Sequence, residues 1–212
     1  MTKSQKTPYK QDDFTKAAKR AKVPPELFDN LDFVTALQIA LSEEKDKYRA
    51  LQWAKLFYQE RPRVFVSYLK NFDDPEVAYR FYQEFKATNG ERIQQLSEWS
   101  KLGLEPPEVK VLMRLFKPSD LERDINLENL IKIIDVARKS GFTLKPTPQQ
   151  KQSLIYLAKN LSKPELLVAW RMVSRNINDI VRYIKVFGED GYERAYSVKE
   201  MGHENTLSFK TK

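Results

Sequence analysis

The 212-residue chain lacks cysteine, and it has a single histidine and six glycines. The absence of cysteine excludes disulfides and thiolate metal sites. A single histidine, His203, excludes a histidine-based metal cluster and argues against a serine–histidine–aspartate triad. No glycine-rich loop of the nucleotide-binding kinds occurs in the sequence. We therefore predict a protein that is not an enzyme and that binds no metal and no other cofactor.

Long hydrophobic runs are also missing. The longest uncharged, apolar-rich run near the start covers residues 33–42, about half of the roughly 20 residues that a transmembrane helix needs. The N-terminal residues MTKSQKTPYKQ contain no apolar core of the kind that a secretory signal requires. The lack of cysteine fits a reducing compartment. We expect a cytoplasmic protein without a membrane partner.

Helix signals dominate the rest of the chain. The low glycine content and the sparse alternation of β-branched residues disfavour a sheet protein. The dipeptide Pro-Glu occurs four times, each time before a periodic apolar stretch, at Pro25, Pro75, Pro107 and Pro164. Proline suits the first position of a helix, and glutamate in the first turn complements the helix dipole. Two more helix starts are predicted at Ser119-Asp120 and at Thr147-Pro148. The sequence predicts an all-α fold of about eight helices, in an irregular multi-helix bundle or a short solenoid-like stack.

Composition along the chain suggests three parts. Residues 1–12 are polar and basic and predict a flexible arm, residues 13–194 predict a single helical domain, and residues 195–212 predict a C-terminal tail. Within the domain, residues 33–57 form one long periodic segment. The spacings between the four Pro-Glu dipeptides are unequal, so they indicate no strict repeat.

Positive charge is concentrated in two places. The net charge is +8, and residues 1–24 and 146–185 each carry seven cations and two anions. The remaining residues therefore sum to −2. Clustered positive charge indicates a surface for an anionic partner, although basic tails and solvated helix faces are also common.

The segment from Pro164 to Lys185 is the strongest candidate for such a surface. Its polar row recurs at helical spacing and consists of Arg171, Arg175, Asn178, Arg182 and Lys185, while an apolar stripe containing Trp170 lies on another face. Such a row could follow a phosphate backbone or could be a solvated face. A cap at Asn176 or Asn178 would break the helix and divide the row.

A second candidate is the basic segment that contains Lys19, Arg20 and Lys22. The apolar spacing over 14–31 is compatible with a helix-turn-helix, whose second helix would start near Pro25. That second helix would be acidic, and Lys22 occupies the turn position where glycine is usual. We prefer the simpler interpretation, a short helix pair that docks the N-terminus.

Together these features predict a nucleic-acid-binding accessory protein, for DNA or RNA, that uses a basic helix face and a basic N-terminal arm. The alternative is a helical protein–protein adaptor, such as a phage, plasmid or secretion-system accessory, that binds an acidic partner surface. Five further residues are minor candidates: Arg61 and Arg63 with Lys70 for a basic surface, and Tyr156 and Tyr183 for a stacking surface.

Overall fold

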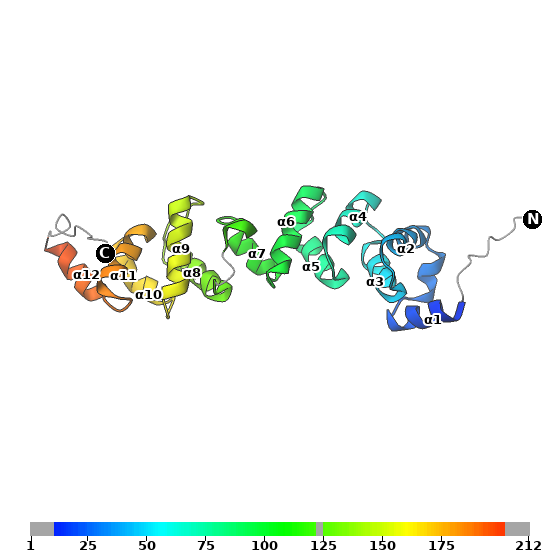
Figure 1. Ribbon diagram of the computed structural model, residues 1–212, viewed down its shortest axis with the longest axis horizontal. Helices are drawn as coiled ribbons and strands as arrows, with labels where there is room; N and C mark the ends of the chain where they lie inside the picture. Colours follow the sequence, from blue (N-terminus) through cyan, green and yellow to red (C-terminus); the bar gives the residue numbers. More distant parts are fainter. Residues whose placement is uncertain (1–10, 122–124, 202–212) are drawn as a thin grey trace, which may run out of the picture. The chain divides into compact units, whose positions relative to one another are not determined.

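The computed structural model describes residues 11–121 and 125–201 (Figure 1), and in this part of the chain 72% of the residues are helical and none lies in a strand. The all-α class is therefore confirmed. The described residues form twelve α-helices and two short 3-10 helices, more than the eight helices expected.

Contacts divide the chain into two compact units, Met1–Pro106 and Pro107–Lys212, where the sequence predicted a single domain over 13–194. Unit 1 contains α1 (Gln11–Arg20), η1 (Pro25–Asp29), α2 (Leu31–Glu43), α3 (Lys47–Phe57), α4 (Pro62–Asn71), α5 (Pro75–Phe85) and α6 (Gly90–Lys101). Next in the chain come α7 (Pro106–Leu112), η2 (Pro118–Asp120), α8 (Leu127–Lys139), α9 (Pro148–Asn160), α10 (Leu166–Val173), α11 (Ile177–Phe187) and α12 (Tyr192–Glu200).

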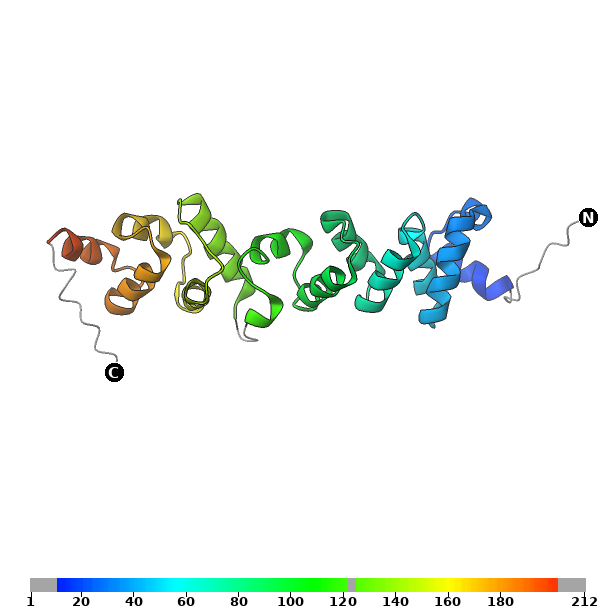
Figure 2. The same ribbon diagram turned by 90° about the horizontal axis from the view of Figure 1, so that it is seen from above.

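Within each unit, helices pack mainly on the next helix and on the next but one. In unit 1, α2 contacts α3 and α4, α3 contacts α5, and α4 contacts α5 and α6. In unit 2, α8 contacts α9 and α10, α9 contacts α11, and α12 contacts both α10 and α11. Alternate helices therefore form two layers inside each unit, as in a short solenoid-like stack. Figure 2 shows the helices of each unit following one another in chain order.

Polar side chains start most of these helices. In each case an Asn, Asp or Thr oxygen accepts a backbone N–H of the first turn, at Asn30, Asp46, Asp74, Asn89, Asn126, Thr147 and Asn176. Such caps satisfy donors that have no partner inside the helix. Pro75 and Pro148 occupy the first helical position of α5 and α9, as predicted.

Several predicted helix boundaries are wrong. Pro25 and Ser119-Asp120 lie in the 3-10 helices η1 and η2, and α10 begins two residues after Pro164. The segment 33–57 is not one helix, because Glu44 is extended and Asp46 caps a new helix. Apolar periodicity continues across this break because both helices bury a stripe, so the period alone did not reveal it.

The two predicted terminal segments also differ from the structure. Helix α1 already begins at Gln11, inside the predicted arm, whose residues 1–10 lie outside the described part of the chain. The predicted tail begins too early, because α12 continues to Glu200 and buries Ala195 completely. Residues 202–212 lie outside the described part.

The core of unit 1 is an aromatic cluster between α3, α4 and α5. Phe57 lies 5.8 Å from Phe65 and 5.3 Å from Tyr68, measured between ring centroids, and Tyr82 lies 5.6 Å from Phe57. Burial, with a hydrogen bond donated to the Glu60 carboxylate, raises the pKa of Tyr82 to about 12. Burial likewise raises the pKa of Tyr68, because an apolar core disfavours the charged phenolate.

One joint recurs in the two units, although the Pro-Glu spacings indicated no strict repeat. Residues 70–76 read KNFDDPE and residues 159–165 read KNLSKPE. In both, the asparagine ends a helix and its Nδ2 donates to the carbonyl four residues earlier, at 2.7 Å for Asn71 and 2.8 Å for Asn160. The same helix ending therefore occurs once in each unit, and the proline that follows begins α5 in one unit and lies two residues before α10 in the other.

The aromatic residue six places after each proline of this joint is a core residue. Phe81 is 1% exposed and Trp170 is 0% exposed, so the predicted burial of Trp170 is confirmed. The indole Nε1 of Trp170 also donates to the backbone carbonyl of Glu189 at 2.8 Å. This contact ties α10 to the turn before α12.

We expect Trp170→Ala to lower the free energy of unfolding by about 3–5 kcal/mol, because it removes a buried ring and leaves a cavity. Urea denaturation followed by circular dichroism measures this change. Trp170→Phe keeps one six-membered ring, loses the rest of the indole with its N–H donor, and leaves a smaller cavity, so it should cost clearly less. A change below about 1 kcal/mol for Trp170→Ala would contradict its place in the core.

Candidate nucleic-acid interface

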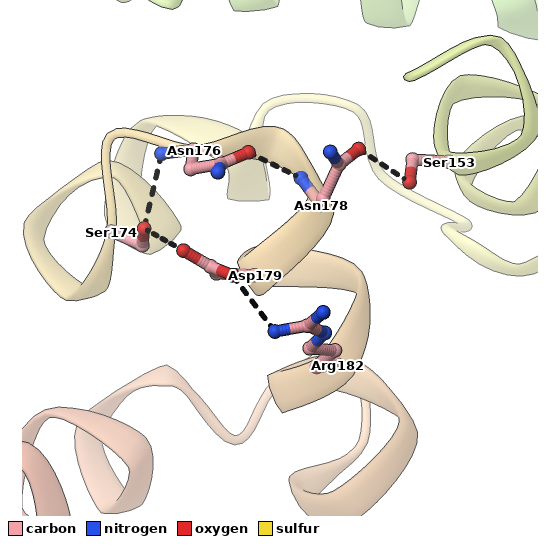
Figure 3. Close-up of polar contacts among 6 residues, drawn as sticks. All are labelled: Ser153, Ser174, Asn176, Asn178, Asp179 and Arg182. Atoms are coloured by element: carbon pink, nitrogen blue, oxygen red, sulfur yellow. Dashed lines mark hydrogen bonds and ion pairs between the residues drawn. The ribbon is translucent and has the colours of Figure 1, made fainter. Parts of the chain in front are cut away.

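The predicted helix from Pro164 to Lys185 is wrong as a single element, because it is broken between α10 and α11. Ser174 is extended at the end of α10, and its Oγ accepts the backbone N–H of Asn176 at 3.0 Å. The Asn176 side chain in turn accepts the N–H of Asn178 at 3.0 Å (Figure 3). The break left open by the sequence therefore occurs, with Asn176 as the cap.

The side chain of Asn178 makes a hydrogen bond inside the protein instead of being free for a ligand. The buried hydroxyl of Ser153, on α9, donates to Asn178 Oδ1 at 2.8 Å (Figure 3). This bond ties the first turn of α11 to α9. Asn178 therefore holds the two helices together, and its amide oxygen is already engaged.

Arg182 and Lys185 form the part of the row that lies on α11. Both are exposed, and Arg182 Nη1 lies 3.4 Å from Asp179 Oδ1 (Figure 3). Lys185 Nζ lies 4.8 Å from the ring centroid of Tyr156, in a cation–π contact with α9. Each of these two cations therefore already has an electrostatic partner, although exposed contacts of this kind are weak.

Arg171 and Arg175 instead meet at a surface pocket of about 470 Å³ at the C-terminal end of α10. The lining residues are Val168, Arg171, Met172, Val173, Ser174, Arg175 and Lys199, and we call this site the α10 pocket. Lys199, from α12, donates its Nζ–H to the backbone carbonyl of Val173 at 2.8 Å. Sequence analysis missed Lys199, since only the packing of α12 on α10 brings it to this site.

Arg171 is held in place on one side of the α10 pocket. Its guanidinium carbon lies 5.5 Å from the ring centroid of Phe142, and its Nε is buried without a hydrogen-bond partner among the described residues. Arg175 is exposed in the turn after α10 and has no ion pair within the described part of the chain. One arginine is therefore oriented by packing, and the other is free to approach a ligand.

The α10 pocket carries excess positive charge. No carboxylate belongs to its lining among the described residues. The C-terminal end of a helix contributes a partial charge of about −0.5, which favours nearby cations. Three formal positive charges exceed that partial charge, so the site is suited to an anion.

The second basic segment ends helix α1 in unit 1. Lys22 adopts a left-handed conformation with φ of 52°, at the position where a helix-turn-helix usually has glycine. Arg20 stacks on Tyr48 with its guanidinium carbon 4.5 Å from the ring centroid, and Lys19 is exposed. The α-helix that a helix-turn-helix would require from Pro25 is absent from this described segment, where η1 forms instead. The contact of α1 with α3 agrees with the preferred docking interpretation.

The minor candidates are not among the residues that line the α10 pocket. Arg61 and Arg63 are exposed at the start of α4, and Lys70 forms an ion pair with Glu43 at 3.6 Å. Tyr183 stacks on Phe187, with ring centroids 6.4 Å apart. None of these residues lines either of the two cationic pockets of the described residues.

A metal site is absent from the described residues. Residues 11–121 and 125–201 contain no group of three or more His, Cys, Asp or Glu side chains that could hold a metal, and His203 lies outside them. In the same residues, no helix combines the length and apolarity of a membrane span.

No family model, curated protein or solved structure matches the chain.

We expect Asn176→Ala to lower the free energy of unfolding by about 1 kcal/mol, because it removes the side-chain cap of α11. Gln152→Ala, an exposed change on α9, is the matched control and should stay within about 0.5 kcal/mol. Chemical denaturation of both variants measures the difference. Equal stability of the two variants would mean that α11 does not depend on this cap.

Proposed function

We propose that this protein is a non-enzymatic nucleic-acid-binding accessory protein that contacts the phosphate backbone through Arg171, Arg175 and Lys199. The observation that carries the proposal is the convergence of these three cations on the α10 pocket, with no carboxylate among the described lining residues. Arg182 and Lys185 extend the contact along α11, and the basic arm adds charge.

Phosphate recognition is the chemistry that this residue set performs best. Arginine offers planar, bidentate donors to phosphate oxygens, and lysine adds a mobile point charge. Cations that neutralise phosphates release condensed counterions, so affinity falls steeply as salt rises. The proposed contacts are made to phosphates and not to base edges, so binding should tolerate changes of base sequence.

The charge distribution supports the assignment to unit 2. Residues 107–212 contain 19 Lys and Arg and 13 Asp and Glu, a net charge of +6, whereas residues 1–106 contribute only +2. Long-range attraction of a polyanion therefore acts mainly on the unit that contains the α10 pocket.

One observation favours the alternative, an adaptor for an acidic protein surface. Val168 and Met172 are 59% and 68% exposed, and both line the α10 pocket. They lie one helical turn apart on α10, beside the cations. A protein segment that combines carboxylates with apolar side chains would cover both kinds of residue.

The deciding experiment compares two double variants that each remove two cations. Arg175→Gln with Lys199→Gln should weaken binding about tenfold per cation at 0.1 M salt. It should also reduce the slope of log affinity against log salt by nearly two for duplex DNA. Arg182→Gln with Lys185→Gln removes the same charge from α11 and should weaken binding less. Fluorescence anisotropy with single-stranded DNA, duplex DNA and RNA of equal length, at two salt concentrations, measures both quantities.

Other outcomes are equally informative. Equal losses in the two double variants would assign binding to the whole surface of unit 2 instead of the α10 pocket. Failure of the unmodified protein to bind all three nucleic acids at low salt would overturn the proposed function. Binding of poly-glutamate in that case would support the adaptor.

The arm gives a separate prediction. Deletion of residues 1–10 removes Lys3, Lys6 and Lys10 but no periodic apolar residue. We expect an unchanged melting temperature and a modest, sequence-independent loss of nucleic-acid affinity, because the arm acts only through charge. A large loss of melting temperature would show that the arm contributes to the core.

A further inference from the structure

A second cationic pocket, in unit 1, is built from the same parts as the α10 pocket. It has a volume of about 220 Å³ and lies where α1 ends, with Arg20, Lys22 and Lys55 in its lining. Its other lining residues are Ala21, directly after α1, three residues of α3, and Glu76 of α5, and all of them belong to one unit. We call this site the α1 pocket.

The two pockets match part by part. Each has an arginine stacked on an aromatic ring, Arg20 on Tyr48 at 4.5 Å in one and Arg171 on Phe142 at 5.5 Å in the other. Each also has a lysine from a neighbouring helix, and this lysine donates to a backbone carbonyl at the end of the first helix. Those bonds run from Lys55 to Ala21 at 3.4 Å and from Lys199 to Val173 at 2.8 Å.

The third cation of each pocket lies in the turn after the helix, at Lys22 or Arg175. The repeated joint at 70–76 and 159–165 contains none of these six cations. The match between the pockets therefore does not follow from that joint. A single cation is enough to complement the C-terminal end of a helix. Each of the two pockets holds three cations.

We propose that the α1 pocket is a second phosphate-binding site, which gives each unit its own contact with nucleic acid. This inference rests on the proposed function. Planar Arg20, fixed against Tyr48, offers a fork of donors, and Lys22 and Lys55 add ammonium groups. The ligand is the phosphodiester group of the backbone, which carries one negative charge.

Glu76 distinguishes the two sites. It lines the α1 pocket, so the charged side chains there sum to +2, whereas those of the α10 pocket sum to +3. A carboxylate repels phosphate and lowers affinity. The α1 pocket is therefore the weaker site, and neutralising Glu76 should strengthen it.

The test is a titration of the full chain with a single-stranded DNA tetranucleotide, followed by backbone amide NMR shifts. We expect two bound tetranucleotides, with shifts near Lys22 for one and near Arg175 for the other. Lys22→Gln with Lys55→Gln should abolish the first set of shifts and leave the second. Lys45→Gln with Lys101→Gln, two exposed changes of unit 1 outside the pocket, should change neither set.

The Glu76→Gln variant tests for a gain of affinity, which misfolding cannot produce. It should raise the affinity of the site near Lys22 about threefold to tenfold, without an effect on the site near Arg175. Shifts confined to the surroundings of Arg175, or an unchanged affinity in Glu76→Gln, would overturn this inference and leave the proposed function intact. Shifts at neither site, with no binding of longer nucleic acids, would overturn both.

Discussion

The helices of this protein are short, and each one depends on its neighbours to exist. The α-helices contain 7 to 13 residues in the described part of the chain, and isolated helices shorter than about 12–15 residues are marginal in water. Helix α10 illustrates the constraint, because its eight residues bury Leu167, Trp170 and Val173 against the rest of unit 2. Side-chain caps and burial on the next two helices together supply the stability that length does not.

This constraint explains what could be predicted from the sequence. The all-α class, the capped start at Thr147 and the burial of Trp170 follow from local signals, which are visible in any short window. The helix breaks within 33–57 and 164–185 were harder to predict, because consecutive helices continue the same apolar period. The division into two units and the position of Lys199 depend on contacts between distant segments, and no local pattern encodes them.

The break at Ser174–Asn176 changes the candidate site from a line into a pocket. A continuous helix of 22 residues would extend about 33 Å and present its cations in one row. The break instead ends α10 after Val173, and α12 packs against it and adds Lys199 beside Arg171 and Arg175. Three cations therefore line one concave surface, whereas a continuous helix would have spaced its cations along its length.

The lysines of the two pockets can serve structure and binding at the same time. An ammonium group has three donors, and Lys199 uses one of them for the carbonyl of Val173. Two donors remain for a ligand, and the bond to the helix end reduces the side-chain entropy that binding would otherwise cost. Lys55 has the same relation to Ala21. Cations that complete a short helix are thereby already positioned for an anion, so one side chain supports both the fold and the proposed contact.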